Sequence, residues 1–172
     1  MIDKLWKFID DNGTFAAKNP HEISRLYFPL ANEAGLLSSI TPTLHGDIKT
    51  GQHTFLTPPV SSEDLQDSRY NRNFWIYVKG KGAWSPASGE TDDSLVEAGL
   101  LWHKVIKMNK HLGLKVDITN FVPVTSETIE IMSVEITNIS RKPVYITPTA
   151  AIPLYGRSAD RLRDHRHVSS LL

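Results

Sequence analysis

Residues 112–119 carry the run Leu-Gly-Leu-Lys-Val-Asp-Ile-Thr, which decides the fold class of this chain. Its apolar residues fall on every second position, so an extended chain would bury one face and wet the other. Met132, Val134 and Ile136 alternate with polar residues in the same way. Both segments therefore predict half-buried β-strands.

The alternation changes phase just before Met132. Ile129 and Ile131 are apolar on the odd-numbered positions, whereas Met132 and Val134 occupy the even-numbered ones. A β-bulge, or a strand that crosses between sheets, would produce such a slip. Residues 138–142 then predict a hairpin loop, followed by a returning strand over 144–147.

Further strand-length runs lie upstream. Residues 25–28 and 74–78 are compact aromatic and aliphatic runs. Gly80-Lys81-Gly82 predicts a turn that leads the second run back into Ala83-Trp84. The polar residues 86–98 predict one long surface loop.

A helical period occurs at one place, the amino terminus. Ile2, Leu5, Trp6 and Ile9 are spaced i, i+3, i+4 and i+7, which predicts a short amphipathic helix. Residues 11–13, Asp-Asn-Gly, are suited to end that helix.

The whole pattern favours an all-β fold. Ten prolines and ten glycines stand mostly between the apolar runs, as expected for many short strands joined by turns. Residues 1–172 contain no internal repeat or linker, which predicts a single domain. Residues 166–172 resemble the start of a further strand, so we expect a domain that is truncated at its carboxyl-terminal end.

Composition restricts the function. The 40% of hydrophobic and 22% of charged residues are typical of a soluble globular protein. Lys plus Arg and Asp plus Glu both number 19, which argues against a nucleic-acid partner. The chain has no cysteine, so disulfides and thiolate metal sites are excluded, and a cytoplasmic location is favoured. No secretory signal and no apolar stretch of membrane-spanning length is present, so no membrane partner is expected.

The sequence lacks the common catalytic motifs. There is no glycine-rich phosphate loop, no zinc-binding His-Glu-x-x-His and no serine nucleophile elbow. The histidines are scattered singly, which favours ordinary surface or hydrogen-bonded roles over metal ligation: His45, His53, His103 and His111. The acidic clusters lie in polar sequence where solvated charges are the simpler interpretation: Glu63, Asp64 and Asp67, then Asp92 and Asp93.

Residues 155–167 form the strongest polar constellation. Four arginines, two aspartates and two histidines occupy these thirteen positions. One interpretation is a solvated loop whose charges pair with one another. The other is an anion or sugar-hydroxyl site, because guanidinium groups match phosphate oxygens and vicinal hydroxyls. The residues alone leave both interpretations open.

The aromatic residues offer a second possible site. Trp75, Trp84, Trp102, Tyr27 and Tyr77 would stack on sugar rings if they were exposed. Their positions in predicted strands favour the core instead, above all for Trp102, which follows two leucines.

Several segments resemble glycoside hydrolase family ninety-four, the inverting phosphorylases of β-linked glucosides. The resemblance covers almost the whole chain in order, through residues 24–36, 44–50, 55–60, 68–75, 119–124 and 151–153, and on into the Arg-rich segment. The branch that acts on β-1,2-linked oligoglucans, related to cyclic β-1,2-glucan synthases, is more similar than the cellobiose phosphorylase branch.

This resemblance implies the amino-terminal, non-catalytic domain of a longer enzyme. Such enzymes continue into a helical linker and an (α/α)₆ barrel, which carries the general-acid Asp and is absent here. The implied fold is an antiparallel supersandwich similar to galactose mutarotase. The implied partners are that barrel, a second copy of the chain in a homodimer, and a β-glucan oligosaccharide. No metal or organic cofactor is implied, and inorganic phosphate is a co-substrate of the full-length enzyme.

By the same resemblance, the Arg-rich segment is a candidate loop for contributing to a partner's active site. We expect Arg163, His165 and Arg166 to bind acceptor sugar hydroxyls or to close the site, supported by Arg157 and Asp160. No residue of this chain is expected to be catalytic. The alternatives are a stand-alone carbohydrate-binding module and a purely structural dimerisation domain.

Overall fold

The computed structural model describes residues 6–20, 23, 26–51, 53–60, 72–87 and 91–158. Within these ranges the regular structure is entirely β, and no α-helix is present. The strands are β1 (Trp6–Phe8), β2 (Phe15–Lys18), β3 (Phe28–Ala31), β4 (Leu37–Ile40), β5 (Ile48–Lys49), β6 (Thr54–Phe55), β7 (Asn73–Val78), β8 (Gly82–Trp84), β9 (Asp93–Gly99), β10 (Trp102–Asn109), β11 (Leu114–Phe121), β12 (Ile131–Asn138), β13 (Ile146–Ala151) and β14 (Arg157–Ser158). The prediction of an antiparallel all-β fold is confirmed.

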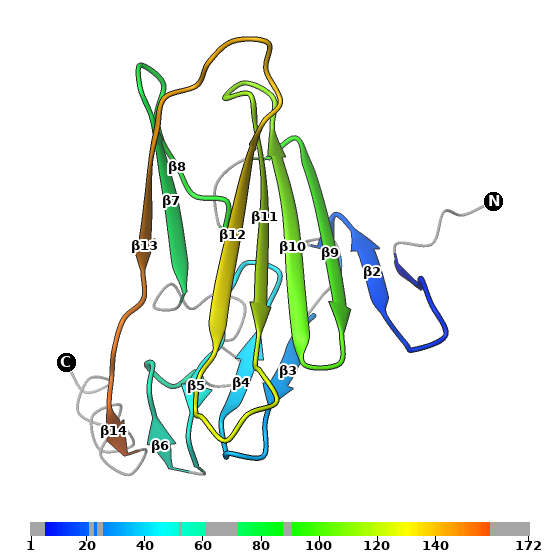
Figure 1. The fold of residues 1–172 in the computed structure, drawn as a ribbon, viewed down its shortest axis with the longest axis vertical. Coiled ribbons are helices and arrows are strands. Elements are labelled where there is room, and N and C mark those ends of the chain that lie inside the picture. Colours follow the sequence, from blue (N-terminus) through cyan, green and yellow to red (C-terminus); the bar gives the residue numbers. More distant parts are fainter. Residues whose placement is uncertain are drawn as a thin grey trace, which may run out of the picture.

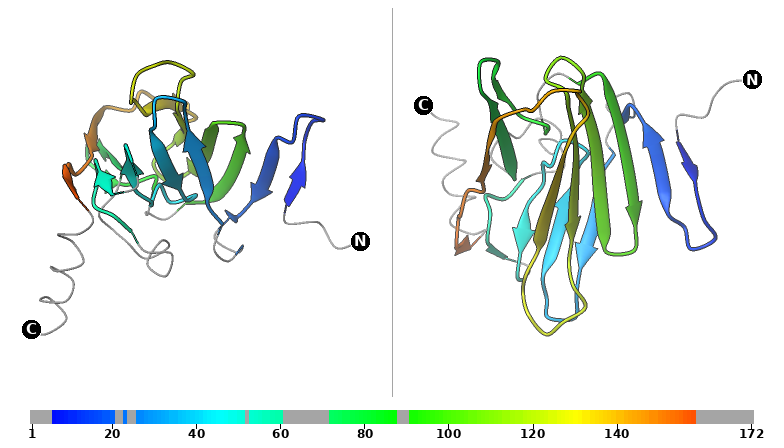
Figure 2. Two further views of the ribbon diagram at one scale, coloured as in Figure 1. Left: turned by 90° about the horizontal axis from the view of Figure 1, so that it is seen from below. Right: turned by 45° about the horizontal axis from the view of Figure 1, so that its top comes forward.

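The strands form three antiparallel sheets. The largest has the order β1-β2-β9-β10-β11-β12, and the others are β13-β7-β8 and β14-β6-β5-β4-β3. Figures 1 and 2 show β3 and β4 behind the lower end of the six-stranded sheet, β5 and β6 to the left of them, and β7, β8 and β13 beside β12. This layered arrangement is that of a β-sandwich.

One hydrophobic core joins the three sheets. The six-stranded sheet contributes alternate residues such as Val105, Val116 and Ile118, all fully buried. Leu30 and Ile40 come from the five-stranded sheet, and other core residues come from β7 and β8. Burial of apolar surface on both sides of this core stabilises the sandwich by about 25 cal/mol per Å².

Strand β11 has the alternating burial that its sequence predicts. In β11 every second side chain, from Leu114 to Asn120, is buried, and the intervening ones are half-buried. Its register with β12 places Met132, Val134 and Ile136 opposite Asn120, Ile118 and Val116, on the same inner face. The β12 residues are only partly buried because β12 is an edge strand.

No bulge interrupts β12. Its register with β11 is continuous from Ile131 to Asn138, and β12 belongs to one sheet, so both predicted explanations, a bulge and a strand that crosses between sheets, are wrong. Ile129 lies before the strand, and Ile131 faces outward with 38% of its surface exposed. The slip in the sequence therefore marks the start of the strand.

The predicted hairpin after β12 is also wrong. The chain turns at 138–142, but β13 pairs with β7, from Ile146 opposite Val78 to Ala151 opposite Asn73. The connection thus carries the chain from the six-stranded sheet to the three-stranded one (Figure 1). Pro148 lies within β13, as an edge strand permits, since proline has no N–H for a second neighbour.

The amino-terminal helix is not seen in the described residues. Trp6 to Phe8 form β1, which pairs with β2, while residues 1–5 lie outside the description. Asp10 closes this hairpin by accepting hydrogen bonds from the backbone N–H groups of Asn12 and Thr14, both at 2.9 Å. The Asp-Asn-Gly signal at 11–13 therefore makes a strand turn rather than a helix end.

Two further predictions need correction. The second half of the loop predicted over 86–98 is β9, where Ser94, Val96 and Ala98 alternate as buried residues. Trp102 is only partly buried, and its indole lies against Gly99 of the neighbouring strand. A methyl group built on Gly99 would meet the Trp102 Nε1 at 2.3 Å, so a larger residue would displace the indole.

Candidate functional site

The structure leaves the predicted sugar-binding residues largely undescribed. Asp160, Arg163, His165 and Arg166 lie outside the described residues. The backbone of Arg157 belongs to β14 and pairs with Phe55 of β6. The interpretation of 157–167 as a binding segment therefore stays a prediction.

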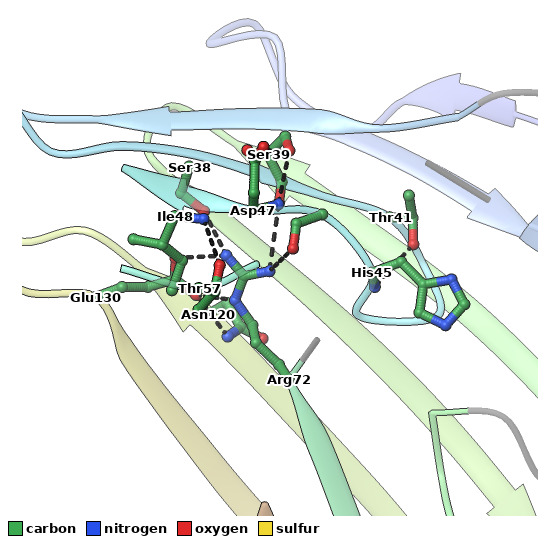
Figure 3. A network of polar contacts seen from close by, with 11 residues as sticks. Ser38, Ser39, Thr41, His45, Asp47, Ile48, Thr57, Arg72, Asn120 and Glu130 are labelled. Atoms are coloured by element: carbon green, nitrogen blue, oxygen red, sulfur yellow. Dashed lines mark hydrogen bonds and ion pairs between the residues drawn. The ribbon is translucent and has the colours of Figure 1, made fainter. Parts of the chain in front are cut away.

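A buried arginine organises the main polar network that the structure does describe. Arg72 stands immediately before β7 and is 2% exposed. Its guanidinium forms a two-pronged ion pair with Glu130, Nε to Oε1 and Nη2 to Oε2, the latter at 2.8 Å. Figure 3 shows these side chains meeting between the sheets.

Every N–H of the Arg72 side chain has an acceptor. Beyond Glu130, Nη2 donates to Ser38 Oγ at 2.5 Å, and Nη1 lies 3.3 Å from the carbonyl oxygen of Ser39 and 3.5 Å from that of Gly46. A guanidinium has five N–H donors, and these contacts account for all of them. Arg72 therefore has no donor left for a ligand, and all of its side-chain contacts lie inside the sandwich.

The acceptors come from separate elements. Ser38 belongs to β4, Glu130 immediately precedes β12, and Arg72 itself leads into β7. Asn120 of β11 adds an amide hydrogen bond to Glu130 Oε1 at 3.1 Å. The network thus links all three sheets at one point.

A second set of contacts supports the same region. Ser39 and Asp47 are joined through a hydroxyl–carboxylate hydrogen bond of 3.3 Å, and Asp47 Oδ2 accepts from the backbone N–H of Val60. Thr57 Oγ1 accepts from the backbone N–H of Ile48 at 2.8 Å. Gly46 permits the close approach, since a Cβ there would lie 2.0 Å from the Ser39 carbonyl oxygen.

Asn32 fixes the neighbouring loop. Its side-chain amide donates to the carbonyl oxygen of Glu127 at 2.8 Å and lies 3.3 Å from that of Pro123. Its Oδ1 accepts from the backbone N–H of Leu36. The loop between β11 and β12 is thereby attached to the turn between β3 and β4.

His103 is the most deeply buried titratable side chain near this network. It is fully buried on β10, opposite Asn120 on β11, and its ring lies 5.3 Å from that of Phe28. Burial, with the nearby charges of Arg72 and Lys107, lowers the pKa of His103 to about 3. Neither ring nitrogen has a hydrogen-bond partner among the described residues, so His103 is a neutral core residue, and the expectation of a surface or hydrogen-bonded role is wrong for it.

Lys107 is a second buried base. It is 6% exposed, and its ammonium donates to Ser94 Oγ at 2.7 Å across the β9–β10 pair. Burial lowers the pKa of Lys107 to about 8. A Ser–Lys pair is a possible nucleophile and base, but both side chains are closed off from solvent, so a substrate has no access to them.

The predicted acidic cluster Asp92–Asp93 lies beside Lys110. Asp92 accepts from the backbone N–H of Lys110, and Asp93, 64% exposed, pairs with the Lys110 ammonium at 3.3 Å. The other predicted acidic cluster, residues 63–67, lies outside the described residues. No group of three or more His, Cys, Asp or Glu in the described part of the chain is placed to hold a metal ion.

The aromatic residues divide between core and surface. Trp84 is buried, as expected, but Trp75 and Tyr77 are 41% and 52% exposed on the outer face of β7. Thr149 and Thr147 of β13 lie directly opposite them. The prediction that all these aromatics belong to the core is therefore wrong for Trp75 and Tyr77, and also for Tyr27, which is 53% exposed.

Sequence reasoning missed the Arg72 network. Arg72 lies between a polar segment and an aromatic strand, and nothing local distinguishes it from a surface arginine. Its position directly before the half-buried strand β7 does not by itself indicate that the arginine is buried.

Comparisons with known proteins add no family. No protein-family model matches the chain, and a search of the curated proteins finds no match. No helix within the described ranges has the length and apolar character needed to cross a membrane.

Proposed function

We propose that this chain is the non-catalytic amino-terminal domain of an inverting glycoside phosphorylase that acts on β-glucans, with β-1,2-linked chains as the preferred class. In the full-length enzyme, phosphate would attack the anomeric carbon while the general acid of the barrel protonates the leaving oxygen. The product would be α-glucose 1-phosphate with inverted configuration. The finer fold under this proposal is the galactose-mutarotase-like supersandwich, and the location is cytoplasmic.

The convergence of the resembling segments on one buried network carries this proposal. Residues 44–50, 55–60, 68–75 and 119–124 resemble family ninety-four, and each contributes to the contacts around Arg72, Asp47 or Asn120. These segments are far apart in sequence but meet in the sandwich (Figure 3). Residues whose contacts hold distant segments together are expected in a scaffold domain that positions other parts of an enzyme.

The Arg-rich segment has a specific place in the proposal. The segment begins with β14, which lies at the edge of the five-stranded sheet and pairs with β6. Arg163, His165 and Arg166 would bind acceptor hydroxyls at the active site of a partner copy, and Arg157 and Asp160 would support them. Guanidinium groups suit this role because they donate several hydrogen bonds in a fixed plane.

The test uses the parent gene product and this chain side by side. Phosphate release from α-glucose 1-phosphate would be measured with β-1,2-gluco-oligosaccharide acceptors. Activity in the parent alone is expected. Turnover by this chain would contradict a non-catalytic role, and inactivity of the parent with every β-glucan acceptor would contradict the phosphorylase assignment.

A double variant then examines the segment itself. Arg163→Ala/Arg166→Ala in the parent should raise KM for the acceptor by about tenfold or more, because charge-assisted hydrogen bonds would be lost. Dimerisation, measured by light scattering, should persist. Lys7→Ala/Lys18→Ala, which removes two exposed charges from β1 and β2, is the matched control. Unchanged kinetics with intact dimers would restrict the segment to a structural role.

A carbohydrate-binding module is the second candidate, favoured by the exposed pair on β7. Trp75 and Tyr77 point to the same side of the strand, and the hydroxyls of Thr147 and Thr149 lie beside them. Aromatic faces with flanking hydroxyls suit the stacking and hydrogen bonding of sugar rings.

Calorimetric titration of this chain with β-gluco-oligosaccharides distinguishes the second candidate. Trp75→Ala/Tyr77→Ala should abolish binding, whereas Tyr27→Ala, at an exposed tyrosine of another region, should not. Absence of any binding by the unmodified chain would eliminate this candidate and leave the scaffold role.

A further inference from the structure

A cationic pocket lies at the end of the sandwich opposite β14. Three connections meet there: the β7–β8 turn, the β10–β11 turn and the chain from β12 to β13 (Figure 1, top). The pocket has a volume of about 400 Å³. Small-molecule sites commonly fall in the range of about 300–1,000 Å³.

Four positive side chains line this pocket. They are Lys79 and Lys81 from the β7–β8 turn, and Arg141 and Lys142 from the connection to β13. Among the described residues, no carboxylate lines the pocket, and none of the four cations forms an ion pair. Clustering like charges is unfavourable, so this end of the molecule would be stabilised by a bound anion.

The pocket walls are held in place by hydrogen bonds. The backbone N–H of Lys79 donates to the carbonyl oxygen of Tyr145 at 3.0 Å, and that of Ile139 donates to Gly113 at 2.9 Å. The Lys81 ammonium donates to the carbonyl oxygen of His111, which leaves two of its N–H groups for a ligand. These contacts tie the three connections to one another, so the site is formed before a ligand arrives.

The Arg141–Lys142 turn is fixed in the same way. Asn138 Nδ2 and Ser140 Oγ both donate to the carbonyl oxygen of Lys142 at 2.8 Å. Asn138 Oδ1 accepts from the backbone N–H of Ser140 at 2.9 Å. Two adjacent cationic side chains are therefore presented from a defined turn rather than from a free loop.

One wall of the pocket is apolar. Tyr145, 71% exposed, carries the Lys79 ammonium 5.9 Å from its ring centroid, and Pro143 and Val144 continue that wall. A ligand with an anionic group and a ring would place the anion among the cations and the ring against Tyr145. Inorganic phosphate alone would leave the aromatic wall unused.

We infer that this pocket binds a small phosphorylated sugar, with the phosphate among Lys79, Lys81, Arg141 and Lys142 and the sugar ring against Tyr145. Phosphate is the fitting anion because its dianionic form offers several acceptor oxygens to four cations. The anion site is drawn from the pocket alone, whereas the choice of a sugar as the ring rests on the proposed function. No carbohydrate polymer is required for it.

Calorimetric titration of this chain at low ionic strength tests the site, with α-glucose 1-phosphate, inorganic phosphate and glucose as separate probes. The sugar phosphate should bind more tightly than inorganic phosphate, and glucose should not bind. Equal affinity for the two phosphate ligands would overturn the sugar part of the inference. Absence of binding by both would overturn the site.

Variants locate the binding. Lys79→Gln/Arg141→Gln should lower the affinity for both phosphate ligands by about tenfold or more, since charge-assisted contacts are lost. Lys7→Gln/Lys18→Gln removes the same charge from β1 and β2 and should leave affinity unchanged. An equal loss of affinity in both double variants would show that binding depends only on net charge and would contradict a defined pocket.

Tyr145→Ala separates the two ligand classes. It should lower the affinity for α-glucose 1-phosphate several-fold and leave the affinity for inorganic phosphate unchanged, because only the sugar would contact the Tyr145 ring. Backbone amide chemical shifts give a readout that does not depend on a variant's folding. Shifts on adding α-glucose 1-phosphate should centre on residues 79–81, 111–113 and 139–145, and shifts centred elsewhere would overturn the assignment.

Discussion

Arg72 and Glu130 are 58 residues apart in sequence, yet their side chains form a two-pronged ion pair inside the sandwich. Both are nearly excluded from solvent, at 2% and 4% exposure. A buried pair is often no better than an apolar replacement of equal shape, but a single unpaired member is costly. This asymmetry makes the pair testable.

Removing one partner should destabilise the fold strongly. We expect Arg72→Met to lower the free energy of unfolding by about 3–5 kcal/mol, because Glu130 would be left buried without its counter-charge. Arg72→Met/Glu130→Met should cost less than the sum of the single variants. Lys110→Met is the control: its pair with Asp93 is 62% and 64% exposed, so its loss should cost at most about 1 kcal/mol. Urea unfolding curves give all four values, and additive costs would show that the pair is not coupled.

The titration of His103 should make the stability of the fold depend on pH in the acidic range. Its pKa is about 3 in the fold, against 6.5 for the ordinary side chain, so between these values the unfolded chain binds a proton that the fold does not. The stability present above pH 6.5 should therefore fall as the pH drops towards 3, with a slope from this group of up to about 1.4 kcal/mol per unit.

His103→Phe should flatten this part of the profile. Phenylalanine has no titrating group and can occupy the space beside Phe28. Thermal unfolding of both proteins from pH 4 to 8 measures the difference. Parallel profiles would show that His103 becomes protonated in the fold without penalty.

The lowered pKa of Lys107 predicts a second pH dependence of stability, at alkaline pH. Its pKa of about 8 in the fold lies below the ordinary 10.5, so the unfolded chain holds the proton more tightly between these values. Stability should rise as the pH increases from 8 to 10.5. Lys107→Met should remove this rise and be at least as stable as the unmodified chain at pH 7, because a buried ammonium is replaced by an apolar side chain. A rise of equal size in the variant would assign the effect to other groups.

The close approach of two turns makes Gly113 sensitive to substitution. Its φ is +75°, and a Cβ would lie 2.8 Å from the Ser140 Cβ. Gly113→Ala should cost about 2–3 kcal/mol, of which about 1 kcal/mol comes from the left-handed backbone. Gly80→Ala is a matched control, because Gly80 has a φ of +79° with nothing within 4 Å of its Cβ position. Denaturant unfolding should rank Gly113→Ala as clearly less stable, and equal costs would contradict the steric argument.

Local sequence patterns predicted some strands well and others poorly. The alternation of strong apolar residues in 114–118 and 132–136 identified β11 and β12. β9 was missed because its inward residues include Ser94 and Ala98, which are too small or polar to produce a clear alternation. For β1, the helical spacing of apolar residues competed with strand pairing, and the neighbouring β2 provided hydrogen bonds that the sequence does not reveal.

The sequence by itself determined the all-β class, the main turns and the absence of disulfides, because period-two alternation, glycine and proline act over a few residues. Only the tertiary structure decided that β13 joins β7 instead of β12. It also brought Arg72 to Glu130, and Lys79 and Lys81 to Arg141 and Lys142. These contacts join residues that are distant along the chain, and their energies depend on burial and on the assembled sheets, which no local pattern contains.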